Sequence, residues 1–395
     1  MNNTFRSLRF LSALLPFAFL SITASHAQLP TTPPDHIVIL IEENYSYTYI
    51  MSTFASYAPH INALTTDTNA AIFTQAFAIT HPSEPNYLQF FSGSNQGETT
   101  DGVPVGYPFT TPNLAAQLIA AGKTFVTYSE DLPSAGSDVV TYTAGGTNYA
   151  RKHNPCANWM GTGANQFSGA VVNLPYTSFP AAANYATLPT VCYVVPNQTN
   201  DMHDGTPPSN ITTGDTWYYS HLSSLLPWAL ANNTLFIIIF DEDDNLHSNN
   251  IPLIFYGPMV KGGTYAEHVD LYSVLRTLEA LYGLGYAGSA ASATTITDCW
   301  RHTITGINNV TNADYSFKVA PNPASGVINF NCNNPLNTQV TINITDQLGR
   351  SAGKYTMTGT EMQVNTASYA PGFYYYRALN DNNNIVGQGK FIINH

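Results

Sequence analysis

The chain has 395 residues, enough for two or more domains, and its 13 Lys and Arg against 25 Asp and Glu give a formal net charge of −12. This acidic balance argues against a nucleic-acid partner, because phosphates require a basic surface. Only 10% of the residues are charged, and such a neutral polar composition suits an exported protein.

The first 27 residues are predicted to be a secretory signal peptide. Arg6 and Arg9 form a basic region, residues 10–22 are apolar, and Ser-His-Ala at 25–27 fits a small-x-small cleavage site. We therefore expect cleavage before Gln28. The apolar stretch is short for a membrane span, which disfavours the alternative of an uncleaved anchor.

Two apolar runs end abruptly in acidic and amide residues. Residues 36–41 lead into Glu42, Glu43 and Asn44, and residues 234–240 lead into the Asp-Glu-Asp-Asp of 241–244. Runs of β-branched residues without alternation predict strands buried on both faces, as in a parallel sheet. Ligands bind beyond the carboxyl ends of such strands. Carboxylates crowded there repel one another unless a cation lies among them, so we expect a metal site.

A helix is predicted to begin close to Ser83. Pro85 suits the first turn of a helix, which places Ser83 just ahead of the N-terminus. There the backbone N–H groups and the helix dipole favour an anion such as phosphate. A serine is a weak nucleophile until its pKa is lowered, and metal coordination does this.

Helix and strand patterns alternate along the rest of this region. Helices are predicted over 113–121 and 272–282, and strands over 124–128, 191–195 and 251–256. Together with the two apolar runs, they predict an α/β domain with a mostly parallel sheet over residues 28–310. From residue 316 to 395 the chain has only short strands, the pattern of a small all-β sandwich.

Export would permit disulfides. The spacing of the four cysteines matches no zinc motif. Cys156 and Cys192 could pair with each other. Cys332 falls in the predicted all-β domain, which leaves Cys299 without an evident partner.

Motifs along the first domain occur in a specific order. They are Ile-Glu-Glu-Asn-Tyr-Ser (41–46), His-Pro-Ser-Glu-Pro-Asn-Tyr (81–87), Lys-His-Asn-Pro (152–155), Pro-Asn (196–197), Asn-Asp-Met-His-Asp-Gly (200–205), Gly-Asp-Thr-Trp (214–217), Asp-Glu-Asp-Asp (241–244) and Glu-His-x-x-x-Tyr-Ser-Val-Leu-Arg-Thr-Leu-Glu (267–279). The ordered set resembles the phosphoesterase family of secreted acid phosphatases and non-haemolytic-type phospholipases C, in the alkaline phosphatase superfamily. The resemblance covers residues 35–300 and implies an alkaline-phosphatase-like α/β/α sandwich.

The resemblance also implies roles for individual residues. The implied metal ligands are Glu43, Asn44, Ser83, Asp241 and Glu242. The implied phosphate-binding residues are Asn86, His153, His203, Asp204 and His268. Ser83 would also be the nucleophile, with His203 and His153 as further catalytic residues. Which of Asp201, His203 and Asp204 reaches the metal or the phosphate stays open, and Asp243 and Asp244 are expected in a solvated turn.

This ligand set fits hydrolysis of a phosphate ester. Hard oxygen ligands suit Ca²⁺, Mg²⁺ or Mn²⁺, and added imidazoles would admit Zn²⁺ or Fe. In-line attack by Ser83 would leave a phosphoserine, which water would then hydrolyse with a histidine as general acid or base. The implied substrate is a small phosphate ester or a phospholipid headgroup.

The leading interpretation is a secreted, metal-dependent phosphomonoesterase. Phospholipase C is the alternative of the same class, but it needs an apolar entrance for lipid, and the chain is short for that branch. A non-catalytic cell-surface binding protein is the alternative of another class, and loss of the serine or the carboxylates would indicate it. Sulfatase chemistry is disfavoured, because Ser83 is followed by Glu-Pro-Asn without the required Arg.

The C-terminal region resembles a second family. Its motifs are Pro-Asn-Pro-Ala-Ser-Gly (321–326), Ile-Thr-Asp-Gln-Leu-Gly-Arg (344–350), Ala-Pro-Gly-Phe-Tyr-Tyr-Tyr-Arg (370–377) and Gly-Lys-Phe-Ile-Ile (389–393). They resemble the C-terminal sorting domain of type IX secretion substrates. The resemblance implies export by the type IX machinery of the outer membrane, then release or attachment at the cell surface. The alternative is a carbohydrate-binding or adhesive sandwich, but residues 374–376 read as strand packing.

Overall fold

The computed structural model describes residues 29–301, 315–333, 339–380 and 385–394. They fall into two compact units that divide between His302 and Thr303. The predicted signal peptide and residues 310–314, next to the predicted domain boundary, lie outside the described residues. Within the described ranges, no helix has the length and apolar character needed to cross a bilayer.

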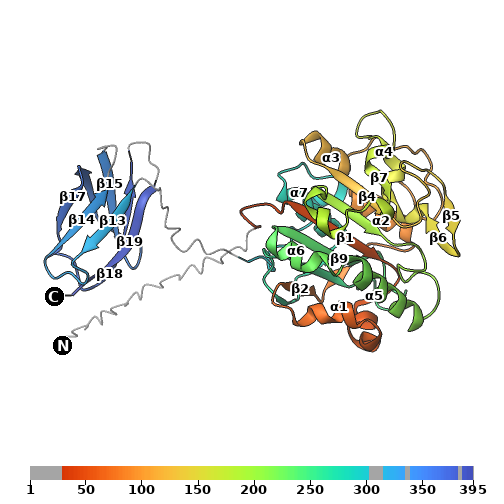
Figure 1. The fold of residues 1–395 in the computed structure, drawn as a ribbon, viewed down its shortest axis with the longest axis horizontal. Helices are drawn as coiled ribbons and strands as arrows, with labels where there is room; N and C mark the ends of the chain where they lie inside the picture. Colours follow the sequence, from red (N-terminus) through yellow and green to blue (C-terminus); the bar gives the residue numbers. More distant parts are fainter. Residues whose placement is uncertain (1–28, 302–314, 334–338, 381–384, 395) are drawn as a thin grey trace, which may run out of the picture. The chain divides into compact units, whose positions relative to one another are not determined.

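The first unit is built on an eight-stranded sheet (Figure 1) with the strand order β11-β2-β10-β9-β1-β8-β4-β7. The strands are β1 (His36–Glu42), β2 (Ala70–Phe73), β4 (Phe125–Ser129), β7 (Asn173–Pro175), β8 (Val191–Val195), β9 (Thr234–Phe240), β10 (Leu253–Tyr256) and β11 (Gly263–Tyr265). β1 is parallel to both β8 and β9, and β4 is parallel to β8 and β7. β10 is antiparallel to β9 and β2, so the sheet is mostly parallel, as predicted.

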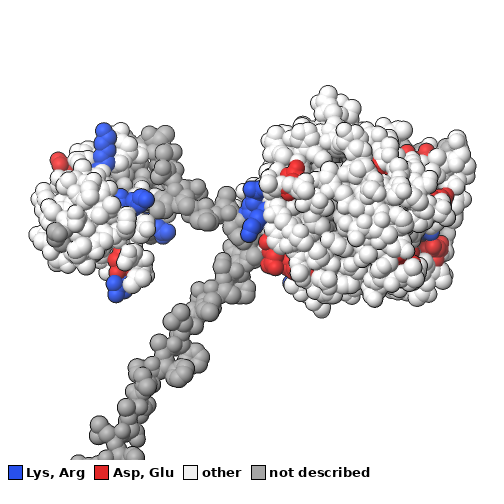
Figure 2. Space-filling view, turned by 90° about the horizontal axis from the view of Figure 1, so that it is seen from below, with Lys and Arg blue, Asp and Glu red and all other residues white. Residues whose placement is uncertain are grey.

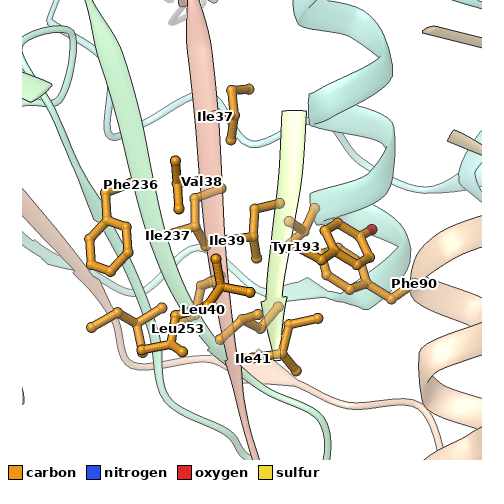
Figure 3. Close-up of a cluster of buried hydrophobic side chains, with 14 of the residues drawn as sticks. Ile37, Val38, Ile39, Leu40, Ile41, Phe90, Tyr193, Phe236, Ile237 and Leu253 are labelled. Carbon is orange, nitrogen blue, oxygen red and sulfur yellow. The ribbon is translucent and has the colours of Figure 1, made fainter. Parts of the chain in front are cut away.

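The centre of this sheet is apolar on both faces. Residues 37–41 of β1 are at most 2% exposed, and Figure 3 shows their side chains packed among those of the neighbouring strands. Fully burying a branched side chain stabilises the fold by about 1.5–3 kcal/mol. The unbroken apolar runs therefore place β1 and β9 in the middle of the fold, which fixes where their carboxyl ends lie.

Helices cover both faces of the sheet. The helices are α1 (Pro59–Ala63), α2 (Ser83–Ser92), α3 (Leu114–Ala120), α4 (Gly169–Val172), α5 (Ser209–Leu222), α6 (Leu225–Ala231) and α7 (Leu271–Leu281). Phe90 of α2 stacks on Tyr193 of β8, and Tyr218 of α5 stacks on Phe236 of β9. On β1, Ile39 is paired with Tyr193 of β8, and the adjacent Val38 is paired with Phe236 of β9. Because successive strand residues point to opposite faces, α2 and α5 lie on opposite sides of the sheet, which gives the predicted α/β/α layers.

The helix bounds follow from local signals. α3 begins after Asn113, whose side chain accepts from the backbone N–H of Ala116 at 2.9 Å. α2 ends at Ser92 and is capped by Gly93, whose φ of 69° favours glycine and where a Cβ would collide with the carbonyl of Ala287. α2 begins at Ser83 and α3 at Leu114, each within a residue of the predicted start.

The second unit is all-β and antiparallel. Its two sheets have the orders β13-β14-β17 and β16-β15-β18-β19. The strands are β13 (Ser316–Ala320), β14 (Val327–Asn333), β15 (Gln339–Asp346), β16 (Ser351–Thr358), β17 (Glu361–Asn365), β18 (Gly372–Leu379) and β19 (Ile385–Ile393). On β18, Tyr374 and Tyr376 are buried while Phe373 and Tyr375 are exposed. The predicted strand packing therefore holds for the two inward tyrosines but not for Tyr375.

The suggested disulfide between Cys156 and Cys192 was wrong. All four cysteines are buried free thiols. The Sγ of Cys156 lies 2.9 Å from the Oγ1 of Thr127 on β4, while Cys192 is enclosed in the centre of β8. Burial also raises the pKa of the Cys156 thiol to about 12, so neither reactivity nor metal binding is expected from it.

Candidate active site

Three chain segments meet at the carboxyl edge of the sheet. The last residues of β1 and β9 are paired in register, so Glu43 and Asp241 leave the sheet side by side. The backbone N–H of Asn44 donates to the Oδ1 of Asp241 at 3.2 Å, and that of Glu43 donates to the carbonyl of Asp201 at 2.9 Å. Asp201 lies in the loop after β8. The carboxylates of two distant apolar runs therefore come together as predicted.

Ser83 faces this carboxylate group. It is the first residue of α2 and only 1% exposed. Its hydroxyl donates to the Oε2 of Glu43 at 3.2 Å. One turn later, the hydroxyl of Tyr87 donates to the other oxygen of Glu43 at 2.5 Å. α2 thus presents a buried serine, held in place, to the acidic end of the sheet.

A histidine completes a compact group of potential metal ligands. The Nε2 of His153 lies 3.3 Å from the Oε2 of Glu43, and its Nδ1 lies 3.2 Å from the Oδ2 of Asp201. Each of Glu43, His153 and Asp201 offers one such atom within 4.8 Å of the others, and all three are buried. The sequence left the role of Asp201 open; its signal was a carboxylate in the loop that follows the buried strand β8.

The electrostatics of this group fit a bound cation. Burial, followed by the neighbouring carboxylates, raises the pKa of Glu43 well above its ordinary value. Burial likewise lowers the pKa of His153, which keeps its imidazole neutral and able to coordinate. Apart from the contacts of His153 with Glu43 and Asp201 given above, the Oδ2 atoms of Asp201 and Asp241 and the Nε2 of His153 have no hydrogen-bond partner among the described residues. Buried polar atoms are normally paired, so these atoms suit a divalent cation with oxygen and imidazole ligands.

Glu242, the residue after Asp241, has contacts different from those of Glu43, His153 and Asp201. Its Oε2 lies 3.1 Å from the Nδ1 of His81 and accepts from the amide of Asn86 at 3.3 Å. The carbonyl oxygen of that amide accepts from the backbone N–H groups of Ile79 and Thr80. Asn86 is therefore engaged with protein atoms, and it would have to release Glu242 to reach a phosphate.

Asp243 is not in a solvated turn, contrary to expectation. It is 1% exposed, and its carboxylate accepts from the backbone N–H groups of Asn245, His247 and Asn249. These bonds fold residues 243–249 into a tight loop beside the site. Asp244 is partly buried and pairs with His247 at 2.7 Å.

The remaining predicted phosphate-binding residues separate into two places. The Nδ1 of His203 lies 2.9 Å from Asp204, and its ring centroid lies 5.4 Å from that of His153. His203 and Asp204 therefore border the group and are partly exposed. His268 is exposed and packs against Phe77 instead of the carboxylates. The cap of α7 is Asp270, which accepts from the N–H of Ser273, so His268 does not cap that helix.

The crowded carboxylates predict a pH-dependent stability in EDTA. Burial and Asp241 raise the pKa of Glu242 from 4.5 to about 9. The folded state therefore prefers the protonated form, so this stabilisation is complete below pH 4.5 and is lost as the pH rises toward 9. The free energy of unfolding in EDTA should fall from pH 5 to pH 9. Unfolding can be monitored by the fluorescence of the four tryptophans, which all lie in the first unit. Added divalent metal should flatten this slope, and an unchanged slope would argue against a cation among these carboxylates.

Comparisons with known proteins agree with this geometry. A model described as the phosphoesterase family matches residues 64–285, and one described as a secretion system C-terminal sorting domain matches residues 318–394. A phosphatidylinositol-3-phosphatase of Mycobacterium tuberculosis is 45% identical over 265 residues, covering 67% of this chain and 82% of that protein. An acid phosphatase of Aspergillus fumigatus is 31% identical over 229 residues, covering 55% of this chain and 49% of that protein.

Among solved structures, a protein in the alkaline phosphatase superfamily from Vibrio parahaemolyticus has a TM-score of 0.48. It is 11% identical and the match covers 86% of this chain and 84% of that one. The matched part of the present chain spans about half the length of the fungal acid phosphatase.

Proposed function

The chain belongs to the phosphoesterase family and is a phosphoric ester hydrolase, and on that premise we propose that it is an exported, metal-dependent phosphomonoesterase with Ser83 as its nucleophile. The family and the hydrolase class predicted from the motifs are thereby confirmed. The sorting domain indicates export, and we propose the type IX machinery as the partner that carries the protein across the outer membrane. The alternative of a silent binding protein is set aside by the family.

One observation carries the proposal. Ser83 stands at the N-terminus of the ten-residue α2, and its Oγ lies 3.2 Å from the Oε2 of Glu43 within a buried group of carboxylates. A helix N-terminus favours an anion, whereas a carboxylate group favours a cation. A phosphate ester bridging the two would bring its phosphorus to the serine hydroxyl.

The metal would be held by the carboxylate side of the site. The proposed ligands are Glu43, Asn44, Ser83, Asp241 and Glu242, with His153 and Asp201 adjoining them. Bound there, a divalent cation lowers the pKa of the serine hydroxyl and offsets charge on the phosphoryl oxygens. The oxygen-rich set suits Ca²⁺, Mg²⁺ or Mn²⁺, and the imidazole admits Zn²⁺ or Fe.

The chain's own residues would carry the remaining steps. Ser83 attacks in line, the alcohol leaves, and a phosphoserine remains. We propose that His203 holds and transfers a proton, because its Nδ1 lies 2.9 Å from the carboxylate of Asp204, which would orient the ring. Water then attacks the phosphoserine, and the two inversions give net retention at phosphorus. Asn86 would bind a phosphate oxygen after releasing Glu242.

The names of the relatives favour a monoester over a diester substrate. Both the phosphatidylinositol-3-phosphatase and the acid phosphatase are named for removing phosphate from a monoester. Phospholipase C, the alternative of the same class, receives no such support. We therefore propose phosphate monoesters as the substrates, including monoesters on lipid headgroups.

Hydrolysis of two chromogenic esters by the full chain tests this function. We expect p-nitrophenyl phosphate to be hydrolysed with a kcat/KM of at least about 10⁴ M⁻¹s⁻¹, the lower end for enzymes on good substrates. EDTA should abolish the activity and one of the five candidate metals should restore it. Preference for p-nitrophenyl phosphorylcholine would reassign the protein to phospholipase C. No turnover of either ester with any metal would contradict the proposal.

A further inference from the structure

A lysine beside the site has no part in the reaction described above. The Nζ of Lys152 donates to the Oδ2 of Asp101 at 2.9 Å and lies 3.0 Å from the Nε2 of His203. Its side chain is 15% exposed, so it is largely enclosed yet reaches the surface of the site. An ammonium has three N–H donors. Two suffice for these partners, so by this count one N–H is left for a ligand.

Asp101 connects this lysine to the helix of the nucleophile. While its Oδ2 accepts from Lys152, its Oδ1 accepts from the backbone N–H of Glu84 at 3.1 Å. Glu84 directly follows Ser83 at the N-terminus of α2. One carboxylate therefore separates the ammonium from the backbone N–H next to the proposed nucleophile. His153, the next residue after Lys152, contacts the same Glu43 oxygen that accepts from Ser83.

Lys152 also supplies positive charge to an otherwise acidic site. It lowers the pKa of both Asp201 and Glu242, although burial is the larger influence and raises both. The pKa of Lys152 is itself raised, because Asp101 and Glu43 outweigh its burial, so the ammonium stays charged. The preceding Arg151 is 2% exposed and is engaged with Asp138 and a backbone carbonyl. Arg151 therefore cannot take the place of Lys152.

We propose that Lys152 is a substrate-binding residue whose ammonium contacts a non-bridging oxygen of the phosphoryl group and selects doubly charged monoesters over singly charged diesters. The inference rests on the proposed phosphoesterase site and names the group that sets its substrate class. Asp101 is the positioning residue that holds the ammonium at the N-terminus of α2.

The physical basis of this selection is charge. A phosphate monoester carries about two negative charges near neutral pH, whereas a diester carries one. A fixed cation at hydrogen-bond distance from the phosphoryl oxygens interacts more strongly with the more highly charged group. The partial enclosure of Lys152 strengthens this preference, because the charge is less screened than on an open surface.

Neutral substitutions of Lys152 test the proposal by a change in selectivity. In Lys152→Met we expect kcat/KM for p-nitrophenyl phosphate to fall by about 100-fold and that for methyl p-nitrophenyl phosphate by about 5-fold, so the monoester preference shrinks about 20-fold. Lys152→Arg should recover most of the preference, because it keeps the charge. Calorimetry should show weaker binding of inorganic phosphate to Lys152→Met, with dimethyl phosphate little changed.

Lys123 offers a matched control. It precedes the first residue of β4 and so lies at the amino ends of the parallel strands, whereas the site lies at their carboxyl ends. Its ammonium lies over the ring of Tyr282. Lys123→Met should leave both activities unchanged. Should Lys152→Met not fold, as judged by tryptophan fluorescence, Lys152→Gln removes the charge while keeping a donor to Asp101.

The outcomes separate this inference from the function on which it rests. Equal loss on monoester and diester in the folded neutral variants, or unchanged phosphate binding, would overturn the role of Lys152 and leave the phosphoesterase proposal intact. An inactive wild-type chain with every candidate metal would instead overturn the proposed function. Asp101→Asn, which weakens the tether, should give a smaller shift in selectivity in the same direction.

Discussion

Replacing Ser83 by alanine is expected to lower kcat/KM for p-nitrophenyl phosphate by about 10⁴-fold or more, since loss of a catalytic nucleophile abolishes the covalent route. The fold should survive, because the serine hydroxyl makes one hydrogen bond to Glu43 and Tyr87 holds the other oxygen of that carboxylate. A lost hydrogen bond costs about 1 kcal/mol. The measurement is steady-state hydrolysis by the full chain with the activating metal present.

Ser92→Ala is the matched control for this loss. Ser92 ends the same helix, is also buried, and its hydroxyl donates to the carbonyl of Leu88 at 2.8 Å. It is nine residues from Ser83 and makes no contact with the carboxylates described above. Ser92→Ala should therefore keep its activity within about threefold, in line with a small structural effect. Substantial activity in Ser83→Ala would show that water is activated directly and that no phosphoserine forms.

A phosphoserine intermediate also predicts that the wild-type chain takes up the phosphoryl group of its substrate covalently. Brief reaction with a ³²P-labelled monoester, followed by acid quenching, should leave label on the peptide that contains Ser83. Ser83→Ala should take up no label while Ser92→Ala labels normally. Label on another residue would reassign the nucleophile without disturbing the family assignment.

Much of the sheet could be predicted because its signal is local. Residues 37–41 and 235–240 are apolar without exception, so only the centre of a covered parallel sheet could accommodate them. Since both strands run in the same direction, the carboxylates that follow them had to meet at one edge. The proximity of Glu43 and Asp241 was thus predictable from two segments separated by about two hundred residues.

Other parts of the site depend on contacts that no local pattern encodes. Asp243 looked like one member of an exposed acidic run, but three backbone N–H groups of its own loop enclose it. The loop forms because Asn245, Ser248 and Asn249 adopt positive φ angles, which Asn tolerates better than most residues. The role of Asp201 was left open for the same reason, because only the folded loop brings its carboxylate to 3.2 Å from the Nδ1 of His153.

The pairing of the cysteines could not be predicted from local sequence either. Export makes a disulfide plausible, and the sequence supplies pairs without stating their geometry. Cys192 belongs to a central strand, whereas Cys156 lies in the short helical turn after Lys152 and packs against Thr127. Sequence spacing alone could not reveal that the two thiols do not pair.

Asp241→Asn is expected to have opposite effects on stability with and without metal. In EDTA the carboxylates repel one another, and burial raises the pKa of Asp241. Asparagine removes one of these charges and keeps an oxygen that can accept from the N–H of Asn44. The variant should therefore be as stable as the wild type in EDTA, or more stable, above pH 7.

With metal present, the wild type should be more stable than Asp241→Asn. A cation at 100 times its Kd stabilises the fold by about 2.7 kcal/mol, which raises the Tm of a domain of this size by about 5–10 °C. The variant should lose most of this shift together with about 10³-fold of its activity, since the cation no longer has a full set of ligands. Tryptophan fluorescence measures the first unit alone within the full chain, because all four tryptophans lie there.

Asp215→Asn separates the metal effect from the loss of any buried carboxylate. Asp215 is 1% exposed and accepts from the backbone N–H groups of His60 and Ile61, away from Ser83. This control should keep the metal-induced rise in Tm even if its stability in EDTA changes. An equal rise in wild type and Asp241→Asn would mean that the cation binds elsewhere, because a carboxylate that coordinates it cannot be replaced without weakening the binding.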